Sequence, residues 1–172
     1  NGNHATQNQT VLINSQPLPT VTSPQNFCIQ DKPTLNAISI STGQNIKWYD
    51  ALTAGTLLPN TTLLQEGTTY YASQTISGCE SERTAVTVKI YDTPAPTGDT
   101  NQPFCTGQNP TLQDIVVTGE SLKWYDALTN GNSLSNTTTL QNGITYYVSQ
   151  TLNSCESKRL AVTVSVQNTP GI

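Results

Sequence analysis

The chain of 172 residues contains little charge, a single histidine and no methionine. Only 10% of its residues are charged, and its few basic residues do not cluster, which argues against a nucleic-acid partner. No apolar run is long enough to cross a membrane. A signal peptide and an initiator methionine are both lacking, so we expect a processed protein or a piece of a longer one.

The scarcity of histidine also limits the chemistry that the chain can perform. His4 lies in the N-terminal tail, so neither repeat contains a histidine that could activate a serine or threonine as a nucleophile. The recurring acids are Asp50 with Asp126, and Glu80 with Glu156. We expect Asp50 to cap a turn and Glu80 to pair with Arg83, with calcium binding or a paired-carboxylate catalytic site as the alternatives. The sequence therefore predicts no enzyme, no cofactor and no metal ion.

An internal repeat is the strongest pattern in the chain. The heptapeptide KWYDALT at Lys47–Thr53 returns unchanged at Lys123–Thr129. Residues 42–91 match residues 118–167 at more than half of their positions, in NTT, TYY, SQT, CES and AVTV among others. Upstream the spacing differs by one residue, and we place this difference in a loop near the Gly43 and Gly119 turns.

Apolar residues alternate with polar ones in each copy, and no stretch keeps a helical period. The alternation predicts strands over residues 33–40, 46–49, 61–64, 68–75 and 84–91 of the first copy. Short strands separated by frequent turns favour an all-β fold of two tandem immunoglobulin-like β-sandwiches. We expect the cores to hold Trp48 with Tyr71 in the first copy and Trp124 with Tyr147 in the second.

The domain prediction follows from the repeat and the prolines. Its segments are an N-terminal strand or linker (1–19), a first module (20–92), a short proline-containing linker (93–99), a second module (100–168) and the start of another linker (169–172). The stretch Ala5–Asn14 lies where the closing strand of a preceding module would fall. It either belongs to such a module or inserts into a neighbouring chain as a donated strand.

Two cysteines occupy equivalent places in each copy. An even number at a repeated spacing favours disulfides over a metal site, and free buried thiols are the other alternative. The predicted pairs join cysteines of the same module, which are Cys28 with Cys79 and Cys105 with Cys155.

A family resemblance follows from these motifs. The pattern FC…PTL…KWYDA…TTYY…SGCES.RTAVTV resembles the Ig-like repeats of very large surface adhesins of gliding and polysaccharide-degrading Bacteroidota. Such repeats occur in SprB-type gliding adhesins and other substrates of the type IX secretion system. The resemblance covers about residues 20–166. It implies an exported, extracellular cell-surface stalk or adhesin module without enzymatic activity.

Two other functions remain open at this point. The chain could be a subunit of an extracellular filament assembled by strand donation, or a carbohydrate-binding module of a secreted enzyme. The expected partners are neighbouring Ig-like modules of the same or adjacent chains, and surface polysaccharide. Tyr49 and Tyr125 are the candidate ligand-facing residues, with Tyr70 and Tyr146 beside them. Cross-strand packing is the plainer interpretation of all four.

Overall fold

The structure is a computed structural model that describes residues 15–168, and its regular elements there are β-strands and short 3-10 helices. The predicted all-β fold is confirmed. The described residues divide into two units, residues 15–25 with 34–88 and residues 26–33 with 89–168. Segment 26–33 therefore belongs to the first sequence repeat but groups with the second unit. The predicted donated strand at Ala5–Asn14 and the linker at 169–172 lie outside the described residues.

Each repeat forms one five-stranded sheet, with the same order of strands. Across the first sheet lie β2 (Gln25–Cys28), β9 (Thr84–Tyr91), β6 (Thr69–Ser73), β4 (Lys47–Tyr49) and β5 (Leu57–Leu58). Across the second lie β11 (Asn101–Cys105), β18 (Leu160–Gln167), β15 (Thr145–Ser149), β13 (Lys123–Tyr125) and β14 (Ser133–Leu134).

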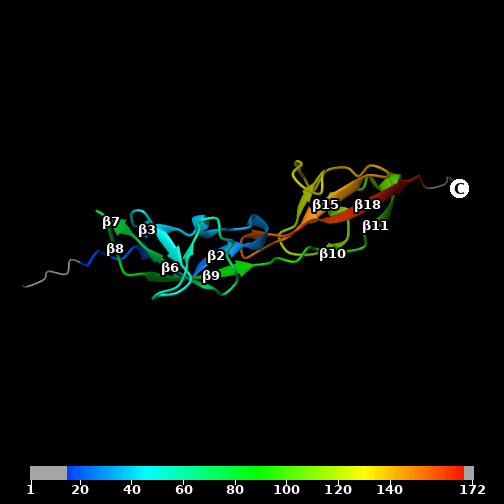
Figure 1. Ribbon diagram of the computed structural model, residues 1–172. Helices are drawn as coiled ribbons and strands as arrows, with labels where there is room; N and C mark the ends of the chain where they lie inside the picture. Colours follow the sequence, from blue (N-terminus) through cyan, green and yellow to red (C-terminus); the bar gives the residue numbers. More distant parts are fainter. Residues whose placement is uncertain (1–14, 169–172) are drawn as a thin grey trace, which may run out of the picture. The chain divides into compact units, whose positions relative to one another are not determined.

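The pairing at one edge of the second sheet decides where its cysteines lie. Strand β11 runs parallel to β18 (Figure 1). The register of this pair places Cys105 opposite Gln167. Strand β15 pairs with β18 in the antiparallel direction, with Tyr146 opposite Val162. A parallel edge strand carries Cys105 to the end of the sheet where β18 finishes.

Short elements accompany each main sheet. The two-stranded sheets are β1 (Thr20–Val21) with β3 (Ile40–Thr42), and β10 (Thr97–Gly98) with β12 (Val117–Thr118). The hairpins are β7 (Thr75–Ile76) with β8 (Cys79–Glu80), and β16 (Thr151–Leu152) with β17 (Cys155–Glu156). The 3-10 helices are η1 (Ile29–Asp31), η2 (Leu35–Ala37), η3 (Thr106–Gln108) and η4 (Leu112–Asp114).

One tryptophan lies in the core of each repeat. Trp48 and Trp124 are each 4% exposed. The buried cluster around Trp124 consists of Leu112, Ile115, Leu140, Tyr146, Val148, Val162 and Val164. The equivalent positions of the first repeat are Leu35, Ile38, Leu64, Tyr70, Ala72, Val86 and Val88, which are also buried. The alternation of the final strands places these valines on the inner face.

The buried tyrosines differ from those expected. Tyr71 and Tyr147 are only half-buried, whereas Tyr70 and Tyr146 are 4% and 5% exposed. The cause is the register, because Tyr70 shares its face with Ala72, which lies opposite Trp48. The backbone N–H of Gln65 donates to the Tyr70 hydroxyl at 3.1 Å, an arrangement typical of a tyrosine corner. Tyr70 and Tyr146 are therefore core residues and are not ligand-facing.

Two further expectations differ in the segment before β4. The strand predicted over residues 33–40 is replaced by the 3-10 turn η2, and only Ile40–Thr42 forms a strand. The one-residue difference between the repeats lies in β3 and not in a loop. In the first repeat Thr20 faces Thr42 and Val21 faces Ile40 across an irregular register, whereas β10 pairs regularly with β12. A β-bulge absorbs an extra residue in an edge strand without reversing the rest of that strand.

Candidate functional site

Strand β4 places Lys47 and Tyr49 on the face of the sheet opposite Trp48. Tyr49 lies across from Tyr71 of β6, and the hairpin β7–β8 brings Glu80 to the same face. We call the group formed there the outer cluster. Its members in the first repeat are Lys47, Tyr49, Ser73, Glu80 and Arg83.

Glu80 accepts three hydrogen bonds within the outer cluster, one from an ammonium group and two from hydroxyl groups. The Lys47 ammonium donates to Oε2 at 2.8 Å, while the hydroxyls of Tyr49 and Ser73 donate to Oε1 at 2.7 and 2.6 Å. These bonds favour the carboxylate, so the pKa of Glu80 falls from 4.5 to about 2, with the bond from Lys47 the largest cause. The hydrogen bond to Glu80 also raises the pKa of Lys47 and of Tyr49.

Arg83 covers the ring of Tyr49 and closes the turn after β4. Its guanidinium carbon lies 3.3 Å from the ring centroid, a cation–π geometry. Its Nη1 donates to the carbonyls of Ala51 and Ala54 at 2.7 and 2.5 Å. Asp50 holds the same turn, because its Oδ1 accepts the Thr56 N–H at 2.7 Å. The motif WYDA, which spans the end of β4 and the turn after it, and the arginine after the hairpin therefore form one structural unit.

The second repeat builds the same outer cluster from its own copies. Glu156 accepts hydrogen bonds from Tyr125 at 2.7 Å and from Ser149 at 2.6 Å, and Lys123 lies 3.8 Å away. Arg159 lies 3.3 Å from the centroid of the Tyr125 ring. Burial opposes ionisation of Glu156, yet the bonds from Ser149 and Tyr125 hold its pKa below the ordinary value. Burial, and then the bond to Glu156, raises the pKa of Tyr125.

A cleft lies beside each outer cluster. In the first unit it has about 370 Å³ and is lined by Tyr49, Leu52, Thr53, Ala54, Glu80, Ser81, Glu82 and Arg83. In the second it has about 870 Å³ and is lined by Leu128, Thr129, Asn130, Ser154, Glu156, Ser157, Lys158 and Arg159, together with Cys28, Gln30 and Asp31. The segment after β2 thus lines the cleft of the second repeat.

The outer-cluster side chains beside these clefts are engaged with one another. Glu80 is ionised at neutral pH and its oxygens are engaged, so it is a poor general acid. The face of Tyr49 covered by Arg83 cannot stack on a sugar ring. Within residues 15–168 no group of three acidic, histidine or cysteine side chains could hold a metal ion.

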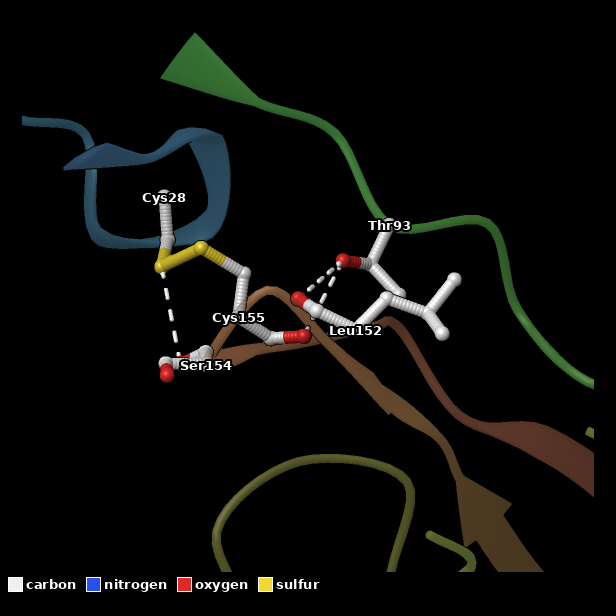
Figure 2. Close-up of a disulfide and its surroundings, with 5 residues drawn as sticks. All are labelled: Cys28, Thr93, Leu152, Ser154 and Cys155. Carbon is white, nitrogen blue, oxygen red and sulfur yellow. Dashed lines mark hydrogen bonds between the residues drawn. A yellow bond between two sulfur atoms is a disulfide. The ribbon is translucent and has the colours of Figure 1, made fainter. Parts of the chain in front are cut away.

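A disulfide joins Cys28 of the first repeat to Cys155 of the second, with a Cα–Cα distance of 5.3 Å (Figure 2). Beside it, the Thr93 hydroxyl approaches the carbonyls of Cys155 and Leu152 at 3.0 and 3.4 Å. Thr93, expected in a linker, is 5% exposed. Cys79 and Cys105 are free and exposed.

This bond corrects the predicted pairs Cys28–Cys79 and Cys105–Cys155. In the second repeat, Cys105 lies opposite Gln167, at the last residue of the eight-residue strand β18. Cys155 precedes the start of that strand. At about 3.3 Å per residue, β18 separates the two cysteines by more than ~20 Å, whereas a disulfide needs Cα atoms within about 7 Å. The predicted pair therefore has its members at opposite ends of one sheet.

The acidic residues also occupy places that the sequence predicted only in part. Asp50 and Asp126 do cap their turns, through the N–H groups of Thr56 and Asn132. The predicted pair of Glu80 with Arg83 is wrong, because Glu80 binds Lys47 and Arg83 binds carbonyls and the Tyr49 ring. The hydrogen bonds that Lys47 and Ser73 donate to Glu80 were not predicted from the sequence. The motifs KWY, SQT and CES, which contain these residues, recur in both copies, and this recurrence is the signal that could have indicated their contact.

Comparison with known proteins identifies the family. The model of the family described as "Ig-like domain CHU_C associated" matches residues 17–91 and 93–167. The chain therefore belongs to this family and carries two tandem copies of its domain. No curated protein matches the sequence.

One solved structure similar to the chain is the N-terminal Ig1-2 module of the Drosophila receptor protein tyrosine phosphatase DLAR. It is 11% identical, and the match covers 88% of this chain and 96% of that one, with a TM-score of 0.31. None of the helices within residues 15–168 is long and apolar enough to cross a membrane.

Proposed function

We propose that the chain is a non-catalytic structural and adhesive part of an exported Bacteroidota cell-surface protein. Its repeats act as a stalk or as weakly binding modules in series. The membership of both repeats in one Ig-like family supports this proposal. The disulfide between Cys28 and Cys155 supports an extracellular location, since such bonds persist in oxidising surroundings.

One observation carries the structural role. The side chains that recur in KWYD and CES.R form contacts with one another in both repeats, between Glu80, Tyr49 and Arg83 and between Glu156, Tyr125 and Arg159. Their recurrence is explained by the turn that they hold, and a ligand is not needed to explain it. A repeated unit whose recurring residues hold its own fold suits a spacer.

Surface location is tested with an antibody raised against residues 93–168 and applied to cells that produce the protein. We expect it to label intact cells as strongly as permeabilised ones. Labelling that requires permeabilisation would contradict export. An antibody against a cytoplasmic protein, which must label permeabilised cells only, is the control for membrane integrity.

A binding role is tested on an array of polysaccharides with the purified chain. Weak binding modules would give a signal that rises when the chain is presented in many copies, because multivalency multiplies weak contacts. Tyr49→Ala and Tyr125→Ala should leave any such signal unchanged if the outer cluster is structural. Loss of the signal in these variants, with folding retained, would favour the carbohydrate-binding alternative. No signal at all would leave the stalk as the role.

A further inference from the structure

The two free cysteines occupy the positions of the two bonded ones. Cys28 is the last residue of β2, and Cys105 is the last residue of β11. Cys155 begins β17 in one hairpin, and Cys79 begins β8 in the other. Each repeat therefore carries one cysteine of each kind, and the known bond joins the β2 cysteine of one repeat to the hairpin cysteine of the repeat after it.

Cys105 has the backbone conformation of its bonded counterpart. Its φ and ψ are −103° and 133°, against −104° and 132° for Cys28. A 3-10 turn follows each of them and ends in a left-handed residue, Asn109 (φ 47°) in one repeat and Lys32 (φ 49°) in the other. The free thiol is thus presented by the same backbone as the bonded one, and no rearrangement is needed before it can react.

The hairpin of the second repeat is covered, and the hairpin of the first is not. Cys155 is 3% exposed and Ser157 is 7% exposed, while Cys79 is exposed and Ser81 is half-buried. The covering segment contains Cys28, Gln30 and Asp31, which line the cleft beside Glu156. In the first repeat the equivalent cleft is lined by its own repeat alone. The first repeat therefore has the equivalent cleft residues, but no segment among the described residues lines that cleft from another repeat.

We infer that Cys79 and Cys105 each form the same disulfide with a further repeat of this family. Cys105 bonds the hairpin cysteine of a repeat that follows it, and Cys79 bonds the cysteine at the end of the β2-type strand of a repeat that precedes it. Successive repeats are then joined twice, by the polypeptide and by a disulfide. This inference deepens the proposed role as repeats in series and rests on it.

The bond forms by thiol–disulfide exchange. One protein thiolate attacks an oxidant disulfide, such as oxidised glutathione, and releases one glutathione thiolate, which takes up a proton. The second protein thiolate then attacks the mixed disulfide and releases the second glutathione. Two protein thiols are oxidised by two electrons, and one glutathione disulfide is reduced to two thiols.

The test uses the full chain with residues 93–168 repeated once after Asn168, which keeps the register of the repeats. The chain is folded in a glutathione redox buffer, free thiols are alkylated, and disulfide-linked peptides are mapped without reduction. We expect Cys28 bonded to Cys155, and Cys105 bonded to the appended copy of Cys155. Cys79 and the appended copy of Cys105 should be alkylated. In the matched Cys105→Ser variant, the appended copy of Cys155 should become alkylated while Cys28–Cys155 persists.

The two possible failures are distinguishable. If Cys28–Cys155 forms but Cys105 is alkylated or bonded elsewhere, the inference is wrong, while the proposed function stands on its own surface-labelling test. If Cys28–Cys155 is also missing, the covalent link between repeats is wrong as a whole. Alkylation of Cys105 in the unextended chain, measured in parallel, shows that the thiol is reactive and that its loss in the extended chain reports bonding.

Discussion

At the scale of single residues, Glu80 connects side chains from elements that lie far apart in the sequence. Its neighbour in sequence, Arg83, lies over Tyr49, while the ammonium bound to Glu80 comes from Lys47 of another strand. A strand periodicity predicts that Lys47 and Tyr49 share a face, and the structure agrees. It does not predict which hairpin will bring a carboxylate to that face.

The lowered pKa of Glu80 predicts a dependence of stability on pH. Its pKa is about 2 in the folded chain and near 4.5 in the unfolded chain. The stabilisation is therefore complete above about pH 5 and is lost as the pH falls toward 2. Because Glu80 is exposed, solvent screening reduces the effect to the order of 1 kcal/mol.

Hydrogen exchange of β4 and β6 between pH 2 and 6, with rates corrected for intrinsic exchange, measures this effect. Glu80→Gln should remove most of the pH dependence in these strands, and Glu82→Gln on the same hairpin should leave it in place. Equal pH dependence in Glu80→Gln and the unchanged chain would show that another carboxylate is responsible.

Trp48 is the residue whose loss should cost the first repeat most. It is 4% exposed, so truncation to alanine leaves a cavity among the inner valines and should destabilise that repeat by about 3–5 kcal/mol. Leu63→Ala, at a side chain 58% exposed, should change stability by less than about 0.5 kcal/mol. Denaturant unfolding followed by peptide-resolved hydrogen exchange measures both. Unchanged protection of β4, β6 and β9 in Trp48→Ala would mean that the indole is not a core residue.

At the scale of elements, the strand with the clearest alternation is the one whose bounds the sequence predicted correctly. The stretch 84–91 alternates over its whole length and forms β9. The stretch 33–40 alternates only at Ile38 and Ile40, and the 3-10 turn at Leu35–Ala37 buries Leu35 by a different geometry. The parallel edge pairing of β11 with β18 leaves no mark on local sequence. The cysteine pairs depend on that pairing, which is why the predicted ones are wrong.

The turn after β4 predicts a difference between two glycines with the same backbone geometry. Gly55 and Gly67 have φ of +71° and +70°, but a Cβ on Gly55 would lie 2.5 Å from Asp50 Oδ1, whereas Gly67 has open space. Gly67→Ala should cost about 1 kcal/mol, the strain of a left-handed alanine. Gly55→Ala should cost more, because the Asp50 cap of the turn must also move.

Denaturant midpoints of the two glycine variants test this difference directly. The comparison cancels the backbone strain that both share, so the remaining difference reports crowding against Asp50 and Ala51. Asp50→Ala removes the cap in advance, and in that background the two glycine variants should differ less. Equal costs in both backgrounds would show that the turn does not depend on the cap.

At the scale of the whole molecule, the disulfide ties residues from both sequence repeats. Cys28 and Cys155 are 127 residues apart, so their bond closes most of the described chain into a loop. Two self-contained modules, which the sequence repeat predicts, would not share such a bond. The segment 26–33, which contains Cys28, belongs to the first sequence repeat but groups with the second unit.

The bond should stabilise the chain chiefly by restricting its unfolded state. For a loop of 127 residues the chain-entropy estimate is about 5 kcal/mol. A reductant should therefore lower the denaturant midpoint of the unchanged chain and have no effect on the double variant Cys28→Ser with Cys155→Ser. The matched double variant Cys79→Ser with Cys105→Ser should respond to reductant as the unchanged chain does, because those thiols are free within it. The assignment would be wrong if the reductant effect were lost in the variant without Cys79 and Cys105 but kept in the variant without Cys28 and Cys155.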